Sequence, residues 1–201
     1  MKYITIDPSG TGTTALVCIS DDKPFKVKVL DEKGEEVMIE TYFYFSEEKD
    51  KEWKEHLNYI IKMVKNFKPD VIVFEETDFI KMMGNDMKHL FKLFGAIECI
   101  QYFIPEIKKI WGIKADQVKV LRRQICSGIK ASEKYTNHNV YSRFPEQVKH
   151  ITFKDGRGGG YFFTHANGRK EKITVHQADA YLVYVIYKEN ERRYFEKRKG
   201  K

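Results

Sequence analysis

A short, uninterrupted apolar run, Val71–Phe74, limits the folds open to this chain more than any other feature of its sequence. Strands buried on both faces are apolar at every position, whereas half-exposed strands alternate between apolar and polar residues. The run lies between two segments with helical spacing of apolar residues, and Pro69 separates it from the first of them. We therefore expect an α/β fold in which this strand is central and helices cover the sheet.

The first 50 residues are rich in β-forming side chains. Residues 3–7 alternate and then stop at the turn residues 8–10, as at the end of a strand. β-Branched and aromatic residues dominate the next segments, so we expect an antiparallel meander of two or three strands. These segments are residues 13–19, 26–30 and 36–45, with a turn at residues 31–34.

Helical spacing of apolar residues predicts three helices in the rest of the chain, over residues 53–67, 85–103 and 175 to about 195. A short strand is expected over residues 118–121. The expected order is thus a β meander followed by α, β, α, β and α. This order indicates a mixed five-stranded sheet, in which an antiparallel meander is joined by parallel strands and flanked by helices.

The length of 201 residues suits a single domain, which we expect to span residues 1–201 with a β-hairpin-like insertion at about 148–175. An apolar fraction of 42% is enough for a buried core and argues against a wholly disordered chain. The net charge of +7 favours a polyanionic partner such as nucleic acid, although a generally lysine-rich composition explains it equally well.

The three cysteines, Cys18, Cys99 and Cys126, are far apart and form no CxxC pair, which argues against a zinc site and favours a reducing compartment. An acid at position 7 comes too early for a signal peptide, and no apolar stretch has the length of a membrane span. We expect a soluble cytoplasmic protein.

Acidic residues end two of the predicted strands. Asp7 ends the first strand, and Glu75 and Glu76 end the apolar run. If the two strands are parallel neighbours, their carboxyl ends share one edge of the sheet, where ligand sites of open α/β sheets form. Since side chains alternate along a strand, only one glutamate can face Asp7. We expect this to be Glu75, with Glu76 supporting it or facing solvent.

A third acid, Asp179, lies near the predicted start of the last helix. Thr174 and Gln177 have the spacing of a capping box, so the helix should begin there, and His176 and Asp179 should share one face of its first turn. An acid at a helix start is often only a partner of the helix dipole. For His176, a helix-start or packing role is as good an explanation as ligand binding.

Three carboxylates that meet at one edge suit a hard divalent cation, above all Mg²⁺. A nearby histidine would also allow Mn²⁺ to substitute. Metal ions held in this way activate water and stabilise the leaving oxygen when a phosphodiester is hydrolysed. The sequence therefore predicts a nuclease centre built from Asp7, Glu75 and Asp179, with His176 beside it.

These motifs together resemble RuvC-type Holliday junction resolvases of the RNase H-like superfamily. Ile4-Thr-Ile-Asp7-Pro8, followed by Gly10, is similar to the opening strand and turn of that family. Pro69-Asp-Val-Ile-Val-Phe-Glu75 is similar to its second motif, and His176-Gln-Ala-Asp179-Ala to its last. The order is kept along nearly the whole chain. Ser9 stands where glycine is usual, and residues 135–175 are longer than the family pattern.

The resemblance implies an RNase H-like fold and a crossover junction endodeoxyribonuclease, active in DNA recombination and repair as a homodimer that makes paired nicks in four-way junctions. It implies that Asp7, Glu75 and Asp179 bind the metal and that His176 is a fourth ligand or a base. The stretch Ala131-Ser-Glu-Lys134 is similar to a family stretch whose lysine assists near the scissile phosphate. The departures fit a divergent member, of phage or mobile-element type.

Several other residues are candidates for DNA contact. The basic residues Lys119, Arg122 and Arg123 stand near the presumed active edge, where phosphate contact and a merely solvated face are equally good explanations. Lys130 and Lys134 are further candidates for phosphate contact. Phe79 follows the catalytic glutamate and belongs either to the core or to a wedge that enters an opened junction.

The glycine-rich segment Asp155–Gly160 lacks the Lys-Ser ending of a phosphate-binding loop, so a hairpin turn is the simpler interpretation. The alternative is a basic arm, in which Arg157, Arg169 and Lys170 contact phosphate while Tyr161 or Phe162 stacks on a base.

Three other functions remain open at this stage. Another RNase H-like nuclease, acting on flaps or RNA–DNA hybrids, would need the same acids. An actin-like ATP-binding or sugar-kinase domain also begins with an acid-led turn, but such proteins need two domains, and 201 residues are too few. A DNA-binding module without catalytic activity would be separated from a nuclease only by an activity assay.

Overall fold

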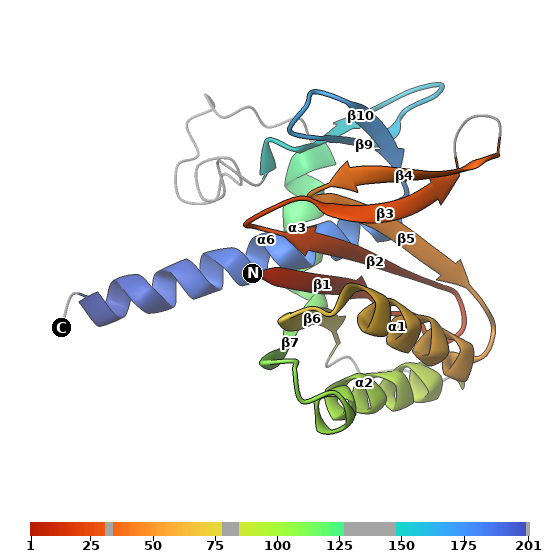
Figure 1. Cartoon of the computed structure of the whole chain (residues 1–201), viewed down its shortest axis with the longest axis vertical. Helices are drawn as coiled ribbons and strands as arrows, with labels where there is room; N and C mark the ends of the chain where they lie inside the picture. The colour runs from red at the N-terminus through yellow and green to blue at the C-terminus, as the bar shows by residue number, and fades with distance from the viewer. Residues whose placement is uncertain (31–33, 78–84, 127–147, 200–201) are drawn as a thin grey trace.

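A computed structural model (Figure 1) describes residues 1–30, 34–77, 85–126 and 148–199 of the chain. Its central sheet has five strands in the order β5-β2-β1-β6-β7. β1 is antiparallel to β2 and β2 to β5, whereas β1 and β6 are parallel, as are β6 and β7. The prediction of a mixed, RNase H-like sheet is confirmed. Its strands are β1 (Lys2–Asp7), β2 (Thr13–Ser20), β5 (Phe43–Lys49), β6 (Val71–Glu76) and β7 (Lys109–Lys114).

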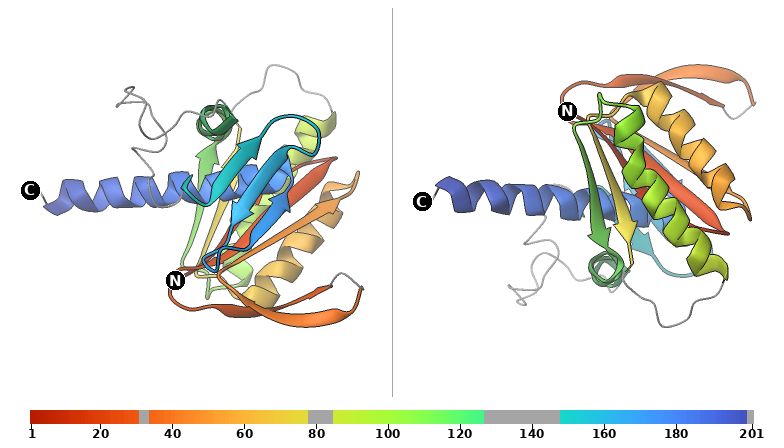
Figure 2. Two further views of the ribbon diagram at one scale, coloured as in Figure 1. Left: turned by 90° about the horizontal axis from the view of Figure 1, so that it is seen from above. Right: turned by 90° about the horizontal axis from the view of Figure 1, so that it is seen from below.

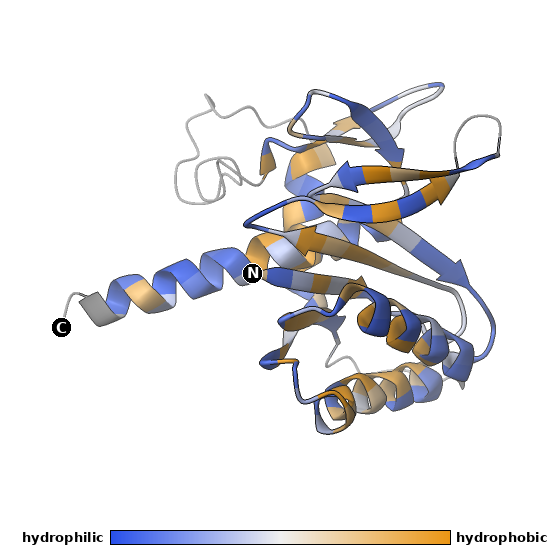
Figure 3. Ribbon diagram, viewed as in Figure 1, coloured by the Kyte–Doolittle hydropathy of each residue, from blue (hydrophilic) through white to orange (hydrophobic). Residues whose placement is uncertain are grey.

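Helices cover both faces of this sheet. Figure 2 shows α1 (Trp53–Phe67) and α2 (Asn85–Phe103) on one face and α6 (Val175–Lys199) on the other. α3 (Ala115–Cys126) packs beside α6. The second half of α6 extends beyond the sheet and is largely hydrophilic there (Figure 3).

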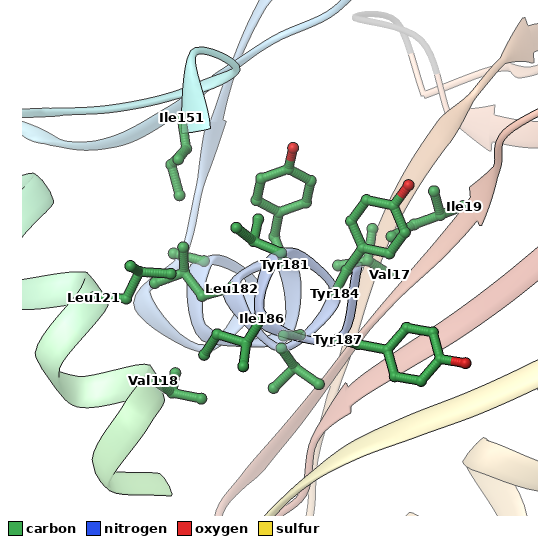
Figure 4. Packing of buried hydrophobic residues seen from close by; sticks show 14 of the residues in the cluster. Val17, Ile19, Val118, Leu121, Ile151, Tyr181, Leu182, Tyr184, Ile186 and Tyr187 are labelled. Atoms are coloured by element: carbon green, nitrogen blue, oxygen red, sulfur yellow. The ribbon is translucent and has the colours of Figure 1, made fainter. Parts of the chain in front are cut away.

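The alternation of side chains in the central strands decides which residues face α6. Ile6 and Phe74 lie in the core under α1 and α2, whereas Tyr3 and Val73 belong to the core under α6. The latter core is built around a continuously buried stretch of α6, and Val118 and Leu121 of α3 complete it (Figure 4). Because the alternation continues to the strand ends, the residues next after Ile6 and Phe74 face α6.

The expected strand over residues 118–121 was wrong. These residues are part of α3, whose buried side chains Ala115, Val118, Leu121 and Ile125 succeed one another at intervals of three or four, as on one side of a helix. The strand at this place in the sheet is β7, which the sequence pattern did not predict. Its sequence, KIWGIK, interrupts an apolar pattern with lysines and a glycine, because β7 is an edge strand and is only partly buried.

The predicted meander also differs in its connections. β3 (Phe25–Leu30) and β4 (Glu36–Thr41) form a separate two-stranded sheet, and β5 takes the place beside β2. β3 carries Lys26 and Lys28 and β4 carries Glu36 and Glu40, and Lys26 and Glu40 pair across the two strands. Such strands cannot fill a buried position next to β2, whereas β5 contributes the buried ring of Phe45.

A third sheet, of order β10-β9-β8, lies over α6 and α3 (Figure 2). It consists of β8 (Ile151–Lys154), β9 (Gly160–Thr164) and β10 (Lys170–Ile173), all antiparallel. The turn between β8 and β9 has positive φ angles of 87° at Gly156 and 78° at Gly158, which glycine adopts without strain. This backbone requirement explains the glycine-rich segment. Within the described part of the chain, no helix is long and apolar enough to cross a bilayer.

The turn after β1 depends on glycine for a steric reason, which gives a testable prediction. A Cβ atom at Gly10 would lie 2.6 Å from the carbonyl oxygen of Asp86 and 2.6 Å from the amide nitrogen of Leu90, both in the backbone of α2. We expect Gly10→Ala to lower the free energy of unfolding by about 1–3 kcal/mol, because the helix backbone must shift. Urea denaturation measures this change.

The matched control is Gly95→Ala, in α2 itself, where an added Cβ meets nothing within 4 Å. Alanine favours a helix over glycine by up to about 1 kcal/mol, so this variant should be more stable than the wild type. Equal effects of the two substitutions would contradict the proposed contact between the turn and α2.

Candidate active site

Two of the predicted acids lie side by side at one end of the sheet. β1 and β6 are paired in parallel up to Ile6 and Phe74, and Asp7 and Glu75 are the next residues of the two strands. Both carboxylates face α6, since their predecessors face α1 and α2. The hydroxyl of Thr14 accepts a hydrogen bond of 2.9 Å from the backbone amide of Ser9 and so closes the turn after Asp7.

The start of α6 brings the third acid to the same place. The Thr174 hydroxyl accepts from the amide of Gln177 at 3.2 Å, and the Gln177 side chain accepts from the amide of Thr174 at 3.0 Å, which is the predicted capping box. One turn on, Asp179 is buried, with 7% of its surface exposed. On the same side, Nδ1 of His176 lies 2.9 Å from a carboxylate oxygen of Asp7.

The pKa values of the carboxyl groups reflect this convergence. Burial raises the pKa of Glu75 to about 8, and the negative charges of Asp7 and Asp179 contribute to the increase. Burial likewise raises the pKa of Asp179 to about 7, although the nearby charge of Arg122 opposes the shift. The pKa of Asp7 is also raised by burial, against the effect of its hydrogen bond with His176. The three acids therefore sense one another's charge and form one electrostatic cluster.

Two cations of α3 stand beside this cluster. The guanidinium of Arg122 forms an ion pair with one carboxylate oxygen of Asp179. The charge of Lys119, one turn earlier, acts to lower the pKa of all three acids. The sequence pattern left phosphate contact and a merely solvated face equally open for these basic residues. The 3–4 spacing of the buried residues of α3 was the signal that Lys119 and Arg122 share a helix face.

The donor atoms of this cluster fit a hard divalent cation. Glu75 Oε2 and Asp179 Oδ1 are buried and have no hydrogen-bond partner among the described residues, a costly state for a carboxylate oxygen that a bound cation would relieve. Among the described residues, no three His, Cys, Asp or Glu side chains are arranged closely enough to hold a metal ion as they stand. Asp7 and Asp179 instead direct an oxygen each to His176 and Arg122, so cation binding would require these contacts to rearrange.

Glu76 lies on the opposite face of the sheet, toward α2. A Cβ atom at Gly112 of β7 would lie 2.2 Å from its carboxylate oxygen Oε2, so glycine at this position leaves the space that the Glu76 side chain fills. Of the two consecutive glutamates, only Glu75 thus joins Asp7 and Asp179.

The remaining predicted DNA contacts are spread over the molecule. Arg123 is exposed on α3, and Arg157 is exposed in the turn between β8 and β9. Arg169 forms an ion pair of 3.2 Å with Glu171, and its guanidinium nitrogen lies 3.1 Å from Nε2 of His165. The predictions for Phe79, Lys130 and Lys134 lie outside the described residues.

Comparison with known proteins supports the fold. No family model matches the sequence, and no curated protein matches it. The structure is similar to that of Thermus thermophilus RuvC in complex with a Holliday junction substrate, with a TM-score of 0.55, 11% identity and 96% coverage of both chains. A second Thermus thermophilus RuvC structure matches with a TM-score of 0.50, 15% identity and the same coverage. The chain therefore has the RNase H-like fold of RuvC.

The raised pKa values predict how the stability of the metal-free protein depends on pH. Glu75 and Asp179, with folded pKa values of about 8 and about 7, hold protons more tightly when folded than when unfolded. In EDTA, their contribution to the free energy of unfolding should be fully present near pH 4 and be lost as the pH rises to about 8. Denaturation at several pH values measures this slope.

Glu75→Gln removes one of these titrations, so the variant should lose less stability than the wild type between about pH 5 and about pH 8. Glu76→Gln, on the other face of the sheet, should leave the contribution of Glu75 in place. An identical slope for the Glu75→Gln variant and the wild type would show that the carboxyl groups are not clustered.

Proposed function

We propose that this protein is a divalent-metal-dependent DNA endonuclease that hydrolyses phosphodiesters at four-way or otherwise branched junctions by paired nicks. The observation that carries the proposal is the convergence of Asp7, Glu75 and Asp179 on one sheet edge, with two buried oxygens that lack hydrogen-bond partners in the described part of the chain. A net charge of +7 favours a polyanionic substrate. The RuvC structure of the same fold was determined with a Holliday junction substrate.

The three carboxylates are the proposed ligands of Mg²⁺. His176 is close enough to Asp7 to act as a fourth ligand, and a nitrogen ligand of this kind would also allow Mn²⁺ to replace Mg²⁺. A bound divalent cation supplies positive charge that stabilises the phosphate during attack by water.

His176 is the proposed base of the reaction. When Asp7 accepts a hydrogen bond from Nδ1, it holds the imidazole ring in place and leaves Nε2 as the nitrogen that can accept a proton from water. The His176 side chain is 44% exposed, so a substrate can reach it, whereas those of Asp7 and Asp179 are only 15% and 10% exposed. The hydrogen bond with Asp7 also raises the pKa of His176, which strengthens it as a base.

The positively charged side chains at this edge of the sheet are proposed to contact the phosphate of the substrate. Lys119 is exposed, and its charge reaches all three acids, so it stands where a phosphate would enter the site. Arg122 is free to contact a phosphate once Asp179 turns toward a cation. From the family resemblance we also propose Lys134 for this role.

Paired nicks require two active sites, and we propose that the protein acts as a homodimer joined through α2. Tyr102 and Phe103, near the end of this helix, are 86% and 83% exposed, which is unusual for aromatic side chains without a partner surface. The exposed Cys99 lies on the same helix and adds to this apolar surface.

The decisive test is cleavage of a mobile four-way DNA junction with Mg²⁺ or Mn²⁺. We expect symmetric nicks from the wild type. Glu75→Gln should reduce the rate by more than the roughly 10–100-fold that loss of a supporting residue costs at a metal site, with junction binding retained. The matched control is Glu76→Gln, which alters the neighbouring residue on the other face of the sheet and should cut normally.

Normal cleavage by the Glu75→Gln variant would refute the site. Cleavage of flaps or RNA–DNA hybrids in preference to junctions would instead assign the same carboxylates to another RNase H-like nuclease.

Sedimentation tests the dimer. The wild type should sediment as a dimer at micromolar concentration, and Phe103→Glu should shift it to the monomer, because a charge cannot be buried in the interface without a partner. Phe195→Glu, at an aromatic residue of α6 that is 55% exposed, serves as control and should leave the dimer intact. A wild type that is monomeric would contradict the paired-nick mechanism.

A further inference from the structure

The three-stranded sheet β10-β9-β8 has two faces of opposite character. Its inner face is apolar, because Ile151, Tyr161, Phe163 and Ile173 are buried in the core around α6. The alternate residues point outward and are exposed or half-exposed. These outward residues, which we call the basic sheet face, are Thr152, Lys154, Phe162, Thr164, Lys170 and Lys172.

The strand register places the members of this face next to one another. Thr152, Phe162 and Lys172 stand opposite one another across the three strands, and Lys170 stands opposite Thr164. Lys154 Nζ lies 5.4 Å from the centre of the Phe162 ring, a cation–π arrangement that holds the lysine over the sheet. The three lysines therefore surround one half-buried aromatic ring.

The charges of this face are not neutralised from within the sheet. Glu171 is the single acid among the strand residues of β8, β9 and β10, and it pairs with Arg169 and His165 away from the outer face. Within the described residues, Lys154, Lys170 and Lys172 form no ion pair. The Nζ atom of Lys172 is 3.5 Å from the carbonyl oxygen of Gly158, a weak contact that leaves its charge uncompensated.

The basic sheet face is joined directly to the candidate active site. β10 ends at Ile173, and the next residues are the capping Thr174 and then His176 of α6. Even a fully extended chain places Lys172 no more than about 14 Å from His176, at roughly 3.3–3.6 Å per residue. At about 3.4 Å per nucleotide of duplex, this is a distance of roughly four nucleotides.

We propose that the basic sheet face binds the sugar–phosphate backbone of a DNA arm that leaves the active site. This inference rests on the proposed function and names the part of the substrate that the third sheet holds. Neighbouring strands are about 4.8 Å apart, so the lysines span roughly 10 Å, which corresponds to about three nucleotide steps along one DNA strand. Lysine contacts of this kind fix the position of an arm without reading its sequence.

The structure also explains why these lysines, rather than Arg169 and Tyr161, carry the role. The guanidinium of Arg169, just before β10, is engaged by Glu171 and His165. Tyr161 is buried, with its hydroxyl 2.9 Å from the sulfur of Cys126, and so cannot stack on a base.

The test compares DNA binding by the wild type with binding by the triple variant Lys154→Gln, Lys170→Gln, Lys172→Gln, which we call the sheet variant. Binding to a four-way junction and to a linear duplex is measured in EDTA, so that no cleavage occurs, over a range of salt concentrations. Each lost phosphate contact lowers the slope of log K against log salt by about 0.9, so the triple variant should lose about 2.7 on both substrates. Circular dichroism checks that the variant is folded.

The matched control removes the same three charges from α1, on the other side of the central sheet, through Lys54→Gln, Lys62→Gln, Lys65→Gln. All three lysines are exposed. This control should keep a slope close to that of the wild type. Equal losses in the two triple variants would mean that only net charge matters, which overturns the proposal.

The outcomes separate this inference from the proposed function. If the wild type cleaves junctions and the sheet variant keeps the wild-type slope, the basic sheet face is not a DNA-binding surface, although the nuclease assignment stands. If the sheet variant loses slope while the wild type cleaves no junction in Mg²⁺, the surface binds DNA and the proposed reaction is wrong. If the wild type binds neither the four-way junction nor the linear duplex, both this inference and the proposed function are wrong.

Discussion

The structure depends on one electrostatic constraint: three acidic side chains are gathered at the buried end of a central sheet. Like charges in a medium of low polarity repel strongly, so the ionised cluster is unfavourable unless positive charge is near. The raised pKa values of Glu75 and Asp179 express that cost, and Arg122, Lys119 and His176 offset part of it. Within the part of the chain that the structure describes, two carboxylate oxygens of the cluster still have no hydrogen-bond partner. A site that is costly to fold without added cations is well suited to bind one.

α6 is the element that makes this arrangement rigid. The start of α6 carries His176 and, in the next turn, Asp179, and the turns that follow are buried between the central sheet, α3 and the third sheet. A helix fixed on several sides cannot rotate, so the positions of His176 and Asp179 relative to Asp7 and Glu75 are set by packing well away from the carboxylate cluster. The third sheet contributes to this core and, through β10, leads directly into α6. A substrate bound to the outer face of that sheet would therefore lie at a defined position relative to the carboxylate cluster.

Local signals were sufficient for several parts of this protein. The apolar run of β6, the helix bounds of α1 and α2 and the capping box at Thr174 agree with the structure, because each depends on residues close together in sequence. Strand alternation indicated that only one of Glu75 and Glu76 can face Asp7, and Glu75, which ends the motif that resembles the family, was the expected one. β7 was missed because an edge strand that is only partly buried lacks a clear apolar pattern, and the neighbouring residues 118–121 were then taken for the strand.

The sequence by itself determined the alternation and periodicity of the elements, and with them the face on which each acid would lie. Only the tertiary structure decided which charges meet. The pairing of Arg122 with Asp179, the placement of β5 instead of β3 beside β2, and the assembly of three lysines on one sheet face all join residues from different elements. The physical reason is that backbone preferences act over a few residues, whereas charge compensation and burial depend on distances in space that no local pattern encodes.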